Sequence, residues 1–196
     1  MTLPIFISTY DRPGSIVLLE GKREVDPIDA EKLVELGRLL AAHTKHILFR
    51  SGNATGSDFL FSSGVAAIDK TRLQVITPKD GHRTKETLTD DIISLDRIDL
   101  AREPKVVYQS KLHKGTQGII EPFAEGKNRN KFSSAAYIIR DTVKVIGTSD
   151  IPPATFGIFY DDLSDPEAGG TGHTMKTCRL NNVPLIDQRT WFGWLG

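Results

Sequence analysis

The chain has 196 residues, 39% hydrophobic and 26% charged, a composition that fits one globular domain and excludes a tandem repeat array or a low-complexity chain. Its 25 basic and 25 acidic residues give a formal net charge of zero, which argues against a large electrostatic footprint for duplex nucleic acid. Cys178 is the single cysteine, so an intramolecular disulfide is excluded and a reducing, cytoplasmic setting is favoured; no stretch has the pattern of a signal peptide or a membrane span.

The first part of the chain predicts alternating strands and helices. Its apolar patterns indicate, in order, an edge segment at residues 5–7, a strand at 15–20, a helix that ends near residue 43, a strand at 47–49, a helix at 58–68 and a strand at 73–77. Either Asp26 or Asp29 is suited to cap the first helix. This alternation predicts a parallel sheet with right-handed crossovers, helices on both faces and a ligand site at the carboxyl ends of the strands.

The middle of the chain, residues 79–130, interrupts this alternation. It is polar and rich in glycine, with weak helical signals at residues 88–100 and a strand-like pattern at residues 106–108. We interpret it as an insertion over the cleft. A surface excursion without ligand contact and a lid or specificity segment explain it equally well, because long loops in compact domains often carry function.

Regular patterns resume after the insertion. A helix, a strand, a helix and a strand are predicted at residues 131–145, 155–160, 175–180 and 183–186. The apolar face of the first of these helices comprises Phe132, Ala135, Ala136, Ile139 and Val143. The whole chain is therefore predicted to form one α/β domain over residues 1–196: a Rossmann-like, doubly wound, mostly parallel five-stranded sheet with an inserted middle segment.

The chain closes with the apolar residues Trp191, Phe192, Trp194 and Leu195. Such aromatics are expected to pack either on the body of the domain or on a partner subunit. A homodimer is one prediction from them, and packing within the chain explains them as simply.

Two glycine-rich segments carry the clearest chemical signal. Residues 167–174 read EAGGTGHT and precede a helical pattern, and residues 50–58 read RSGNATGSD and follow an apolar strand. Glycines let the backbone approach an anion, and the N–H groups at a helix N-terminus favour a phosphate. Two such loops on one sheet predict a cleft for a nucleotide.

These loops resemble those of the SLOG superfamily, which contains the Lonely Guy phosphoribohydrolases, the DNA-processing protein Smf and many uncharacterised phage and bacterial Rossmann-like proteins. The resemblance rests on three segments in order. Residues 21–23 match a Gly-x-Arg loop after the first strand, residues 50–58 match a Ser-Gly-Gly-Ala-x-Gly-x-Asp loop, and residues 169–174 match a Gly-Gly-Thr-x-x-Thr loop. The resemblance covers nearly the whole chain except the middle insertion, and it implies a nucleotide or nucleotide-derived ligand.

The candidate ligand-binding residues come from these three segments. They are Gly21, Arg23, Arg50, Ser51, Gly52, Asn53, Thr55, Gly56, Asp58, Gly169, Gly170, Thr171, Gly172, His173 and Thr174. The backbone and hydroxyl groups of the downstream loop are predicted to hold one phosphate, and the hydroxyl and amide groups of the upstream loop ribose or a second phosphate. Arg23 and Arg50 follow strands, where a guanidinium can bind a phosphate with two hydrogen bonds, although a solvated arginine is the alternative for each.

Three carboxylates and one histidine have two interpretations each. Asp58 can accept a ribose hydroxyl or cap its own helix, and we favour the cap. Asp161 and Asp162 can bind ribose or a metal, or can simply form a turn before Pro166. For His173 we expect ligand contact rather than proton transfer, although most loop histidines do neither.

Enzymatic activity is the least supported expectation. Phosphoribohydrolases of this superfamily carry Pro-Gly-Gly-x-Gly-Thr-x-x-Glu, whereas Met175 and Lys176 occupy the start of the helix here. Without that glutamate, cleavage of an N-glycosidic bond loses its main catalytic group, and only Asp58, Asp161 or Asp162 could replace it. We therefore favour binding over hydrolysis and assign no catalytic residue.

Three functions of different classes remain. The first is a sensor or sequestering protein for a nucleotide or nucleotide-derived ligand. We assign it no further cofactor and no metal site. The second is a nucleotide-processing hydrolase of the phosphoribohydrolase kind. The third is a DNA-processing accessory protein, against which the balanced charge and the lack of an aromatic stripe both argue.

Overall fold

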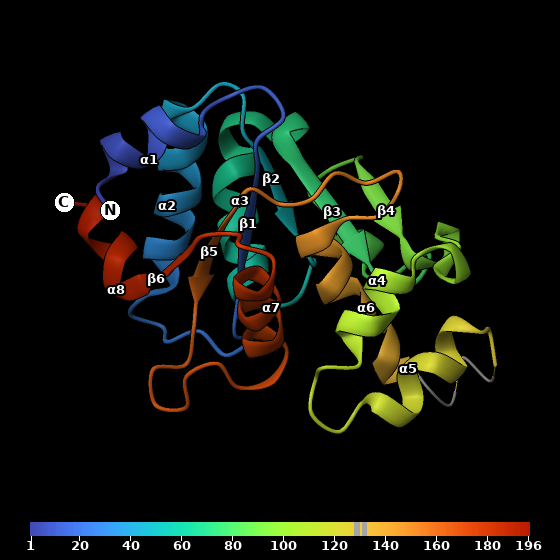
Figure 1. The fold of residues 1–196 in the computed structure, drawn as a ribbon. Helices are drawn as coiled ribbons and strands as arrows, with labels where there is room; N and C mark the ends of the chain where they lie inside the picture. Colours follow the sequence, from blue (N-terminus) through green and yellow to red (C-terminus); the bar gives the residue numbers. More distant parts are fainter. Residues whose placement is uncertain (128–129, 131–132) are drawn as a thin grey trace.

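The computed structural model describes residues 1–127, 130 and 133–196. Within them, six strands form one parallel sheet in the order β4-β3-β2-β1-β5-β6 (Figure 1). The strands are β1 Ile16–Gly21, β2 Leu48–Ser51, β3 Leu73–Thr77, β4 Ile92–Ser94, β5 Phe156–Tyr160 and β6 Leu185–Asp187. The chain thus moves outward from β1 to β4 and then returns to the other side of β1.

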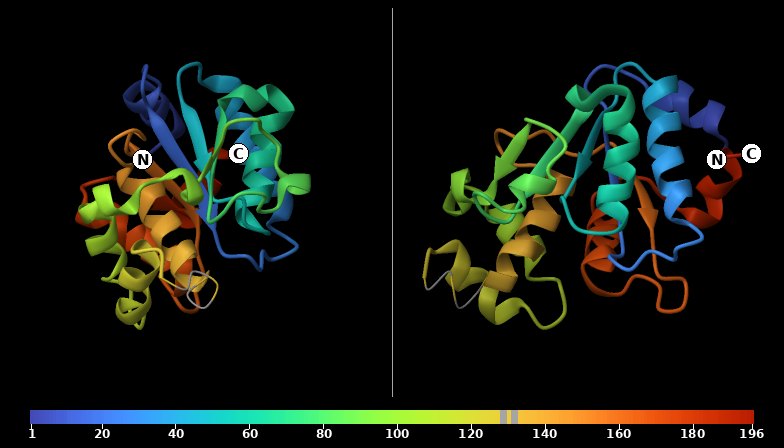
Figure 2. Two further views of the ribbon diagram at one scale, coloured as in Figure 1. Left: turned by 90° about the vertical axis from the view of Figure 1, so that its right-hand side faces the viewer. Right: turned by 180° about the vertical axis from the view of Figure 1, so that it is seen from behind.

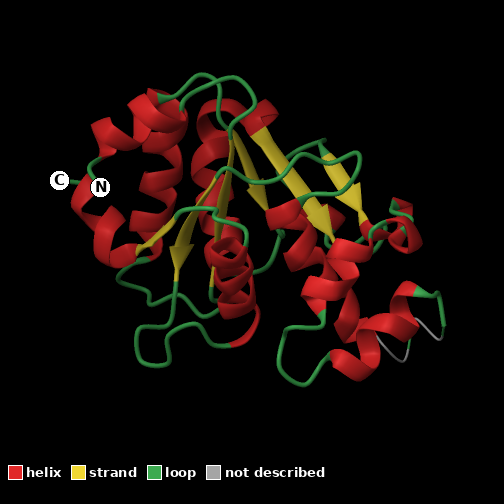
Figure 3. Ribbon diagram, viewed as in Figure 1, coloured by secondary structure: helices red, strands yellow, loops and turns green. Residues whose placement is uncertain are grey.

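Helices cover both faces of this sheet (Figures 2 and 3). They are α1 Leu3–Tyr10, α2 Ala30–His43, α3 Ser57–Asp69, α4 Pro104–Ser110, α5 Gln117–Ala124, α6 Ser133–Ile146, α7 Gly169–Leu180 and α8 Gln188–Trp191. Alternate residues of β1 show the two faces. Val17 and Leu19 pack in a core with α1, α2, α3 and α8, whereas Leu18 packs with α6 and α7.

The reversal of strand order places the carboxyl ends of β1 and β5 side by side. Gly21, the last residue of β1, pairs with Tyr160, the last residue of β5. The connections that leave these two ends run to opposite sides of the sheet, which opens a crevice between them. The order of the strands therefore leaves a crevice at the carboxyl ends of β1 and β5, the place where such sheets bind ligands.

Three predicted elements differ from the structure. The apolar residues 5–7 lie in helix α1, where Pro4 occupies the first turn and only Phe6 is buried, because a short apolar run fits a strand or a helix equally. Residues 106–108 lie in α4, which Pro104 begins. A strand, β4, stands where a weak helix was expected, so the sheet has six strands instead of five.

Helix α6 agrees with its predicted helix from Ser133 onward. The first two residues predicted for it, including Phe132, lie outside the described residues. The described part of the middle segment packs against α6: Val106 of α4 and Phe123 of α5 share a core with Ile139 and Val143.

The terminal aromatics pack within the chain. Trp191 is fully buried and its Nε1 donates to the carbonyl oxygen of Phe159 at 2.9 Å, and Trp194 donates to that of Met1 at 3.1 Å. They need no partner subunit, so the homodimer stays a prediction without this support. Among the described residues, no helix is both long and apolar enough to cross a membrane.

Candidate functional site

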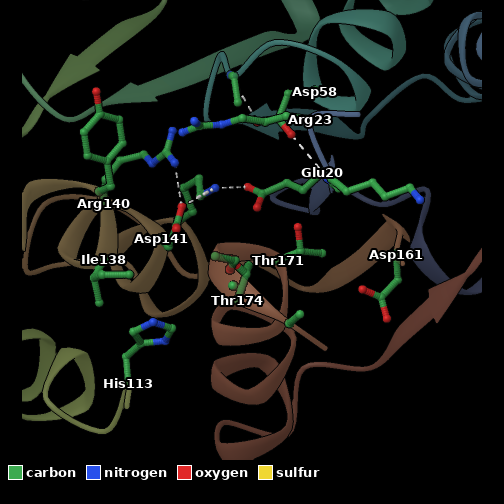
Figure 4. Close-up of a pocket in the computed structure, with 18 of the residues that line it drawn as sticks. Glu20, Arg23, Asp58, His113, Ile138, Arg140, Asp141, Asp161, Thr171 and Thr174 are labelled. Atoms are coloured by element: carbon green, nitrogen blue, oxygen red, sulfur yellow. Dashed lines mark hydrogen bonds and ion pairs between the residues drawn. The ribbon is translucent and has the colours of Figure 1, made fainter. Parts of the chain in front are cut away.

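A cleft of about 700 Å³ opens at the carboxyl ends of β1 and β5 (Figure 4). Its walls are the segment after β1, the loop before α3, the buried side of α6 and the first turn of α7. His113 and Thr116 of the middle segment complete the wall beside α6. This volume lies in the range of roughly 300–1,000 Å³ typical of small-molecule sites.

The downstream glycine segment forms the first turn of α7 rather than a loop before it. The helix begins at Gly169, not near residue 175, and Gly169, Gly170 and Thr171 all line the cleft. Within the described residues, no side chain caps this turn. The first N–H groups of a helix have no partner inside the helix, so the positive end of α7 opens into the cleft.

The remaining residues of that segment hold the turn in place. A Cβ on Gly172 would overlap the carbonyl oxygen of Glu167, so the glycine lets residues 161–168 fold against the helix. Thr174 lines the cleft but is buried, and its hydroxyl donates to the carbonyl oxygen of Gly170 at 3.0 Å. Thr171 is therefore the more available hydroxyl of the two.

Asp58 joins the ends of two strands. Its Oδ1 accepts from the N–H of Gly21 at 3.3 Å, and its Oδ2 accepts from the N–H groups of Gly52 and Ala54 at 3.2 and 3.3 Å. The side chain is buried although it lines the cleft. It therefore fixes the loops after β1 and β2, and the favoured interpretation, that it caps its own helix α3, is wrong because no side chain caps that helix within the described residues.

Most of the upstream loop points into the protein. The Ser51 hydroxyl accepts from the N–H of Asn53, whose side-chain amide donates to the Thr87 hydroxyl at 2.8 Å. Gly56 has φ +78°, and a Cβ there would overlap the carbonyl oxygen of Arg23. Of the predicted residues in this loop, only Asp58 lines the main cleft, while Thr55 lines a smaller alcove beside it.

Arg50 lies outside the cleft, contrary to its expected place at a strand end. The side chain is fully buried within β2; its Nε donates to Gln74 Oε1 at 2.7 Å, and its Nη1 donates to the carbonyl oxygens of Lys144 and Pro152 at 2.9 Å. Its guanidinium binds protein groups on the far side of the strand, so it ties β2 to β3 and α6.

His173 also lies away from the main cleft. The helical start of α7 turns its side chain toward α6, where Nε2 is 2.9 Å from the Thr142 hydroxyl, and its ring stands edge-on to that of His113. Burial lowers the pKa of His173 to about 4. The imidazole is therefore neutral near pH 7 and borders a second cavity, of about 410 Å³, on the other side of α7.

The floor of the cleft is a group of four buried charges that the sequence analysis did not single out (Figure 4). Lys144 Nζ lies 2.5 Å from Glu20 Oε1 and 2.8 Å from Asp141 Oδ1, and Arg140 Nη2 lies 2.9 Å from the same Asp141 oxygen. The available signal was three charged residues in an otherwise apolar helix and one acid at the end of an apolar strand.

The two carboxyls of this floor titrate in opposite directions. Burial raises the pKa of Glu20 to about 7, against the opposing charge of Lys144. Burial also acts to raise the pKa of Asp141, but the charges of Arg140 and Lys144 outweigh it and hold that pKa below its usual value. Asp141 is thus the negative charge that balances Arg140 and Lys144. Glu20 can gain or lose a proton near neutral pH.

The rim carries exposed charges. Arg23 lies on it and is exposed, and Figure 4 shows its side chain extended toward Arg140. Lys22 lies 3.7 Å from Asp162, whose carboxylate also accepts from the N–H and the hydroxyl of Ser164. Asp161 is buried and accepts from the N–H of Glu167 at 3.0 Å, so both aspartates stabilise the turn that was one of their predicted roles.

The position of the phosphoribohydrolase glutamate supplies no acid. Met175 is buried in the core against β1 and β5, and Lys176 is exposed beside the second cavity. Any acid for that chemistry must come from another element. Among the described residues, no group of three or more His, Cys, Asp or Glu side chains is placed to hold a metal ion.

Comparison with known proteins gives a fold but no family. No family model matches the chain, and no curated protein matches it. Among solved structures, DNA processing protein A from Helicobacter pylori, described as binding single-stranded DNA, superimposes with a TM-score of 0.54 at 14% sequence identity. The match covers 92% of this chain and 67% of that one, and at this identity it shows a shared α/β, Rossmann-like fold.

Proposed function

We propose that the cleft binds a nucleotide or nucleotide-derived ligand, and that the protein senses or sequesters this ligand. The observation that carries the proposal is the uncapped first turn of α7, which opens into the cleft where the strand order reverses. Doubly wound α/β sheets bind their ligands at such a reversal, and the N-terminus of a helix there favours a phosphate. The order of the three SLOG-like segments supports the same site.

The residues suggest a role for each part of the ligand. A phosphate at Gly169, Gly170 and Thr171 receives backbone N–H groups, with Arg23 on the rim as its counter-charge. Glu20, on the floor, offers a carboxylate to ribose hydroxyls. His113 and Thr116 form part of the wall, which supports the proposal that the middle segment covers the cleft.

A second candidate function, hydrolysis of an N-glycosidic bond, is favoured by Glu20. Its carboxyl lies in the cleft with a pKa raised to about 7, a value suited to a general acid or base. Asp58 and Asp161, two of the three acids that the sequence suggested, are occupied by backbone N–H groups, and the third, Asp162, accepts from Ser164. The reaction would break the bond from ribose to base, add water to the ribose carbon and return a proton to the base.

A third candidate, binding of single-stranded DNA, is favoured by the fold shared with DNA processing protein A. The sequence argued against nucleic acid, and this likeness weakens that argument. Binding of a strand predicts an affinity for oligonucleotides that falls steeply as salt is raised.

The test is a thermal-shift screen of the full chain with nucleoside mono- and diphosphates, ADP-ribose, cyclic nucleotides and a thymidine oligonucleotide. A ligand of the folded state raises the unfolding midpoint, and Arg23→Gln should weaken that shift, whereas Arg12→Gln, an exposed arginine outside the cleft, should not. No shift with any compound would contradict the proposal.

Each shifting compound is then recovered and analysed by chromatography. Intact ligand supports the sensor function. Release of free base, abolished by Glu20→Gln, would instead establish the hydrolase, and a shift with the oligonucleotide alone would establish the DNA-binding function.

A further inference from the structure

Beside the main cleft lies a smaller alcove of about 190 Å³, between the loop before α3, the loop around residue 83 and α6. Arg23, Tyr137 and Arg140 line both spaces, so the alcove opens directly into the cleft. Its volume is below that of a complete small-molecule site, so it can hold only one part of a ligand.

The lining of the alcove is cationic. Arg23, Arg83 and Arg140 all border it together with His82, and among the described residues that line it none is acidic. Figure 4 shows Arg23 extended toward Arg140 across this space. Like charges gathered in this way repel each other and are stabilised when an anion lies between them.

Two guanidinium nitrogens of the arginines that line the alcove have no acceptor among the described residues. They are the Nε atoms of Arg83 and Arg140, and both are buried. The rest of Arg140 is committed, because Nη1 donates to the carbonyl oxygen of Gly52 at 2.5 Å and Nη2 pairs with Asp141. Buried donors without acceptors are unfavourable, so an anion that accepts from them would remove this cost.

His82, which lines the alcove, lies close to the same positive charges. Burial lowers the pKa of His82, and the positive charges of Arg140, Arg83, Lys79 and Arg23 lower it further. The ring also stands edge-on to Tyr137, at 5.9 Å between centroids. A bound anion would oppose this lowering of the His82 pKa, because it compensates the surrounding cations.

The loop that carries Arg83 is fixed in position. Arg83 has φ +51°, a left-handed conformation, and its carbonyl oxygen accepts from the Thr87 hydroxyl at 3.0 Å and from the amide of Asn53 at 3.4 Å. Asn53 thus links the glycine loop before α3 to the loop of Arg83. This gives the predicted ligand residue Asn53 a role in placing an arginine.

We propose that this alcove binds a second phosphoryl group of the same ligand whose first phosphoryl group lies at the start of α7. The inference rests on the proposed function and narrows its ligand to nucleotides that carry two phosphoryl groups. These groups can be adjacent, as in a diphosphate, or attached to separate oxygens of the nucleoside, as along a nucleic acid strand.

The test compares AMP, ADP and adenosine 3′,5′-bisphosphate, together with the corresponding thymidine compounds, by calorimetric titration of the full chain. The second phosphoryl group should raise affinity about tenfold or more, as expected for charge-assisted hydrogen bonds. A gain with ADP alone indicates a diphosphate, and a gain with the 3′,5′-bisphosphate alone indicates a strand-like ligand.

The variant is Arg83→Asn, because asparagine accepts the left-handed conformation of this position. It should abolish the gain and leave the affinity for AMP unchanged. Lys85→Asn, an exposed residue of the same loop outside the alcove, is the matched control, and Arg83→Gln, whose side chain is closer in size to arginine, is a second variant should Arg83→Asn fold poorly.

The outcomes separate the inference from the proposed function. If AMP or TMP binds and a second phosphoryl group does not raise the affinity, the proposed phosphoryl site in the alcove is overturned. The proposal of a nucleotide-binding cleft is not affected by this result. An equal gain in wild type and Arg83→Asn also overturns it. If none of the six compounds binds, the inference fails, whereas the proposed function fails only if the whole thermal-shift screen is also without effect.

Discussion

Lys144 Nζ lies 2.5 Å from Glu20 Oε1 and so joins the last turn of α6 to the end of β1. The same nitrogen is 2.8 Å from Asp141, which also pairs with Arg140. Asp141 thus has two cationic partners, whereas Glu20 shares one, and the contact of Glu20 with Lys144 is an ion pair without good hydrogen-bond direction. This asymmetry leaves Glu20 as the less compensated carboxylate of the cleft floor.

The first prediction concerns the stability of the protein against pH. The pKa of Glu20 is raised from 4.5 to about 7 in the folded protein, so between these values the folded form binds more protons than the unfolded form. Stability is therefore highest below pH 4.5, as far as this group is concerned, and is lost as pH rises to about 7. Relative to Glu20→Gln, the wild type should lose up to about 3 kcal/mol across this window.

Urea denaturation at several pH values measures this difference. Glu31→Gln, which changes an exposed glutamate on α2, should follow the wild type at every pH. Parallel stability curves for the wild type and Glu20→Gln would show that the carboxyl of Glu20 has an ordinary pKa.

The second prediction concerns His173. Burial lowers its pKa to about 4, so the unfolded chain binds more protons between pH 6.5 and 4, and stability should fall as pH drops through this range. The ring signals of His173 in an NMR titration should not move between pH 8 and pH 5. A midpoint near 6.5 would place the ring in solvent and contradict its packing against α6.

Local sequence pattern predicted the part of the fold that depends on local structure. The strands at residues 15–20 and 73–77 end in polar residues, and both segments contain adjacent β-branched apolar residues, which favours a buried strand. Two short segments, residues 5–7 and 106–108, were predicted wrongly, because three apolar residues fit a strand or a helix. The edge strand Ile92–Ser94 is held by its neighbour β3, a contact that no local pattern contains.

The candidate site, like the fold, was predicted only in part from the sequence. The glycines of residues 169–172 predicted an anion-binding turn; the structure places Gly169 and Gly170 in the wall of the cleft, and anion binding there stays a prediction. Arg50 and His173 were predicted as ligand-binding residues from their positions in the sequence. The geometry of β2 and α7 directs both side chains away from the cleft. Arg140 and Lys144 were missed because their burial beside β1 results from tertiary packing alone.

The third prediction separates Arg50 from Arg23. Arg50→Met leaves Gln74 and the carbonyl groups of Lys144 and Pro152 without their donor, which should destabilise the protein by about 2–4 kcal/mol in urea denaturation. Its affinity for the ligand found in the screen should be unchanged while it is folded. Arg23→Gln should give the opposite result, with unaltered stability and weaker binding. Equal loss of affinity in both variants would show that Arg50 also contributes to ligand binding.

The fourth prediction compares two glycines of the same helical turn. In Gly172→Ala the new Cβ would overlap the carbonyl oxygen of Glu167, so the loop over α7 must shift, at a cost of about 1–3 kcal/mol. In Gly170→Ala the Cβ meets only Asp141 Oδ2, at 3.3 Å, and stability should stay within about 1 kcal/mol of the wild type.

Ligand binding should respond differently from stability in these two variants. Gly170 lines the cleft, so a methyl group there should obstruct a phosphate at the start of α7 and reduce the thermal shift even though the fold is intact. Urea denaturation with and without ligand measures both effects on one sample. If Gly170→Ala binds as the wild type does, the phosphate does not approach this turn, because the added carbon occupies the space through which the backbone N–H groups would reach it.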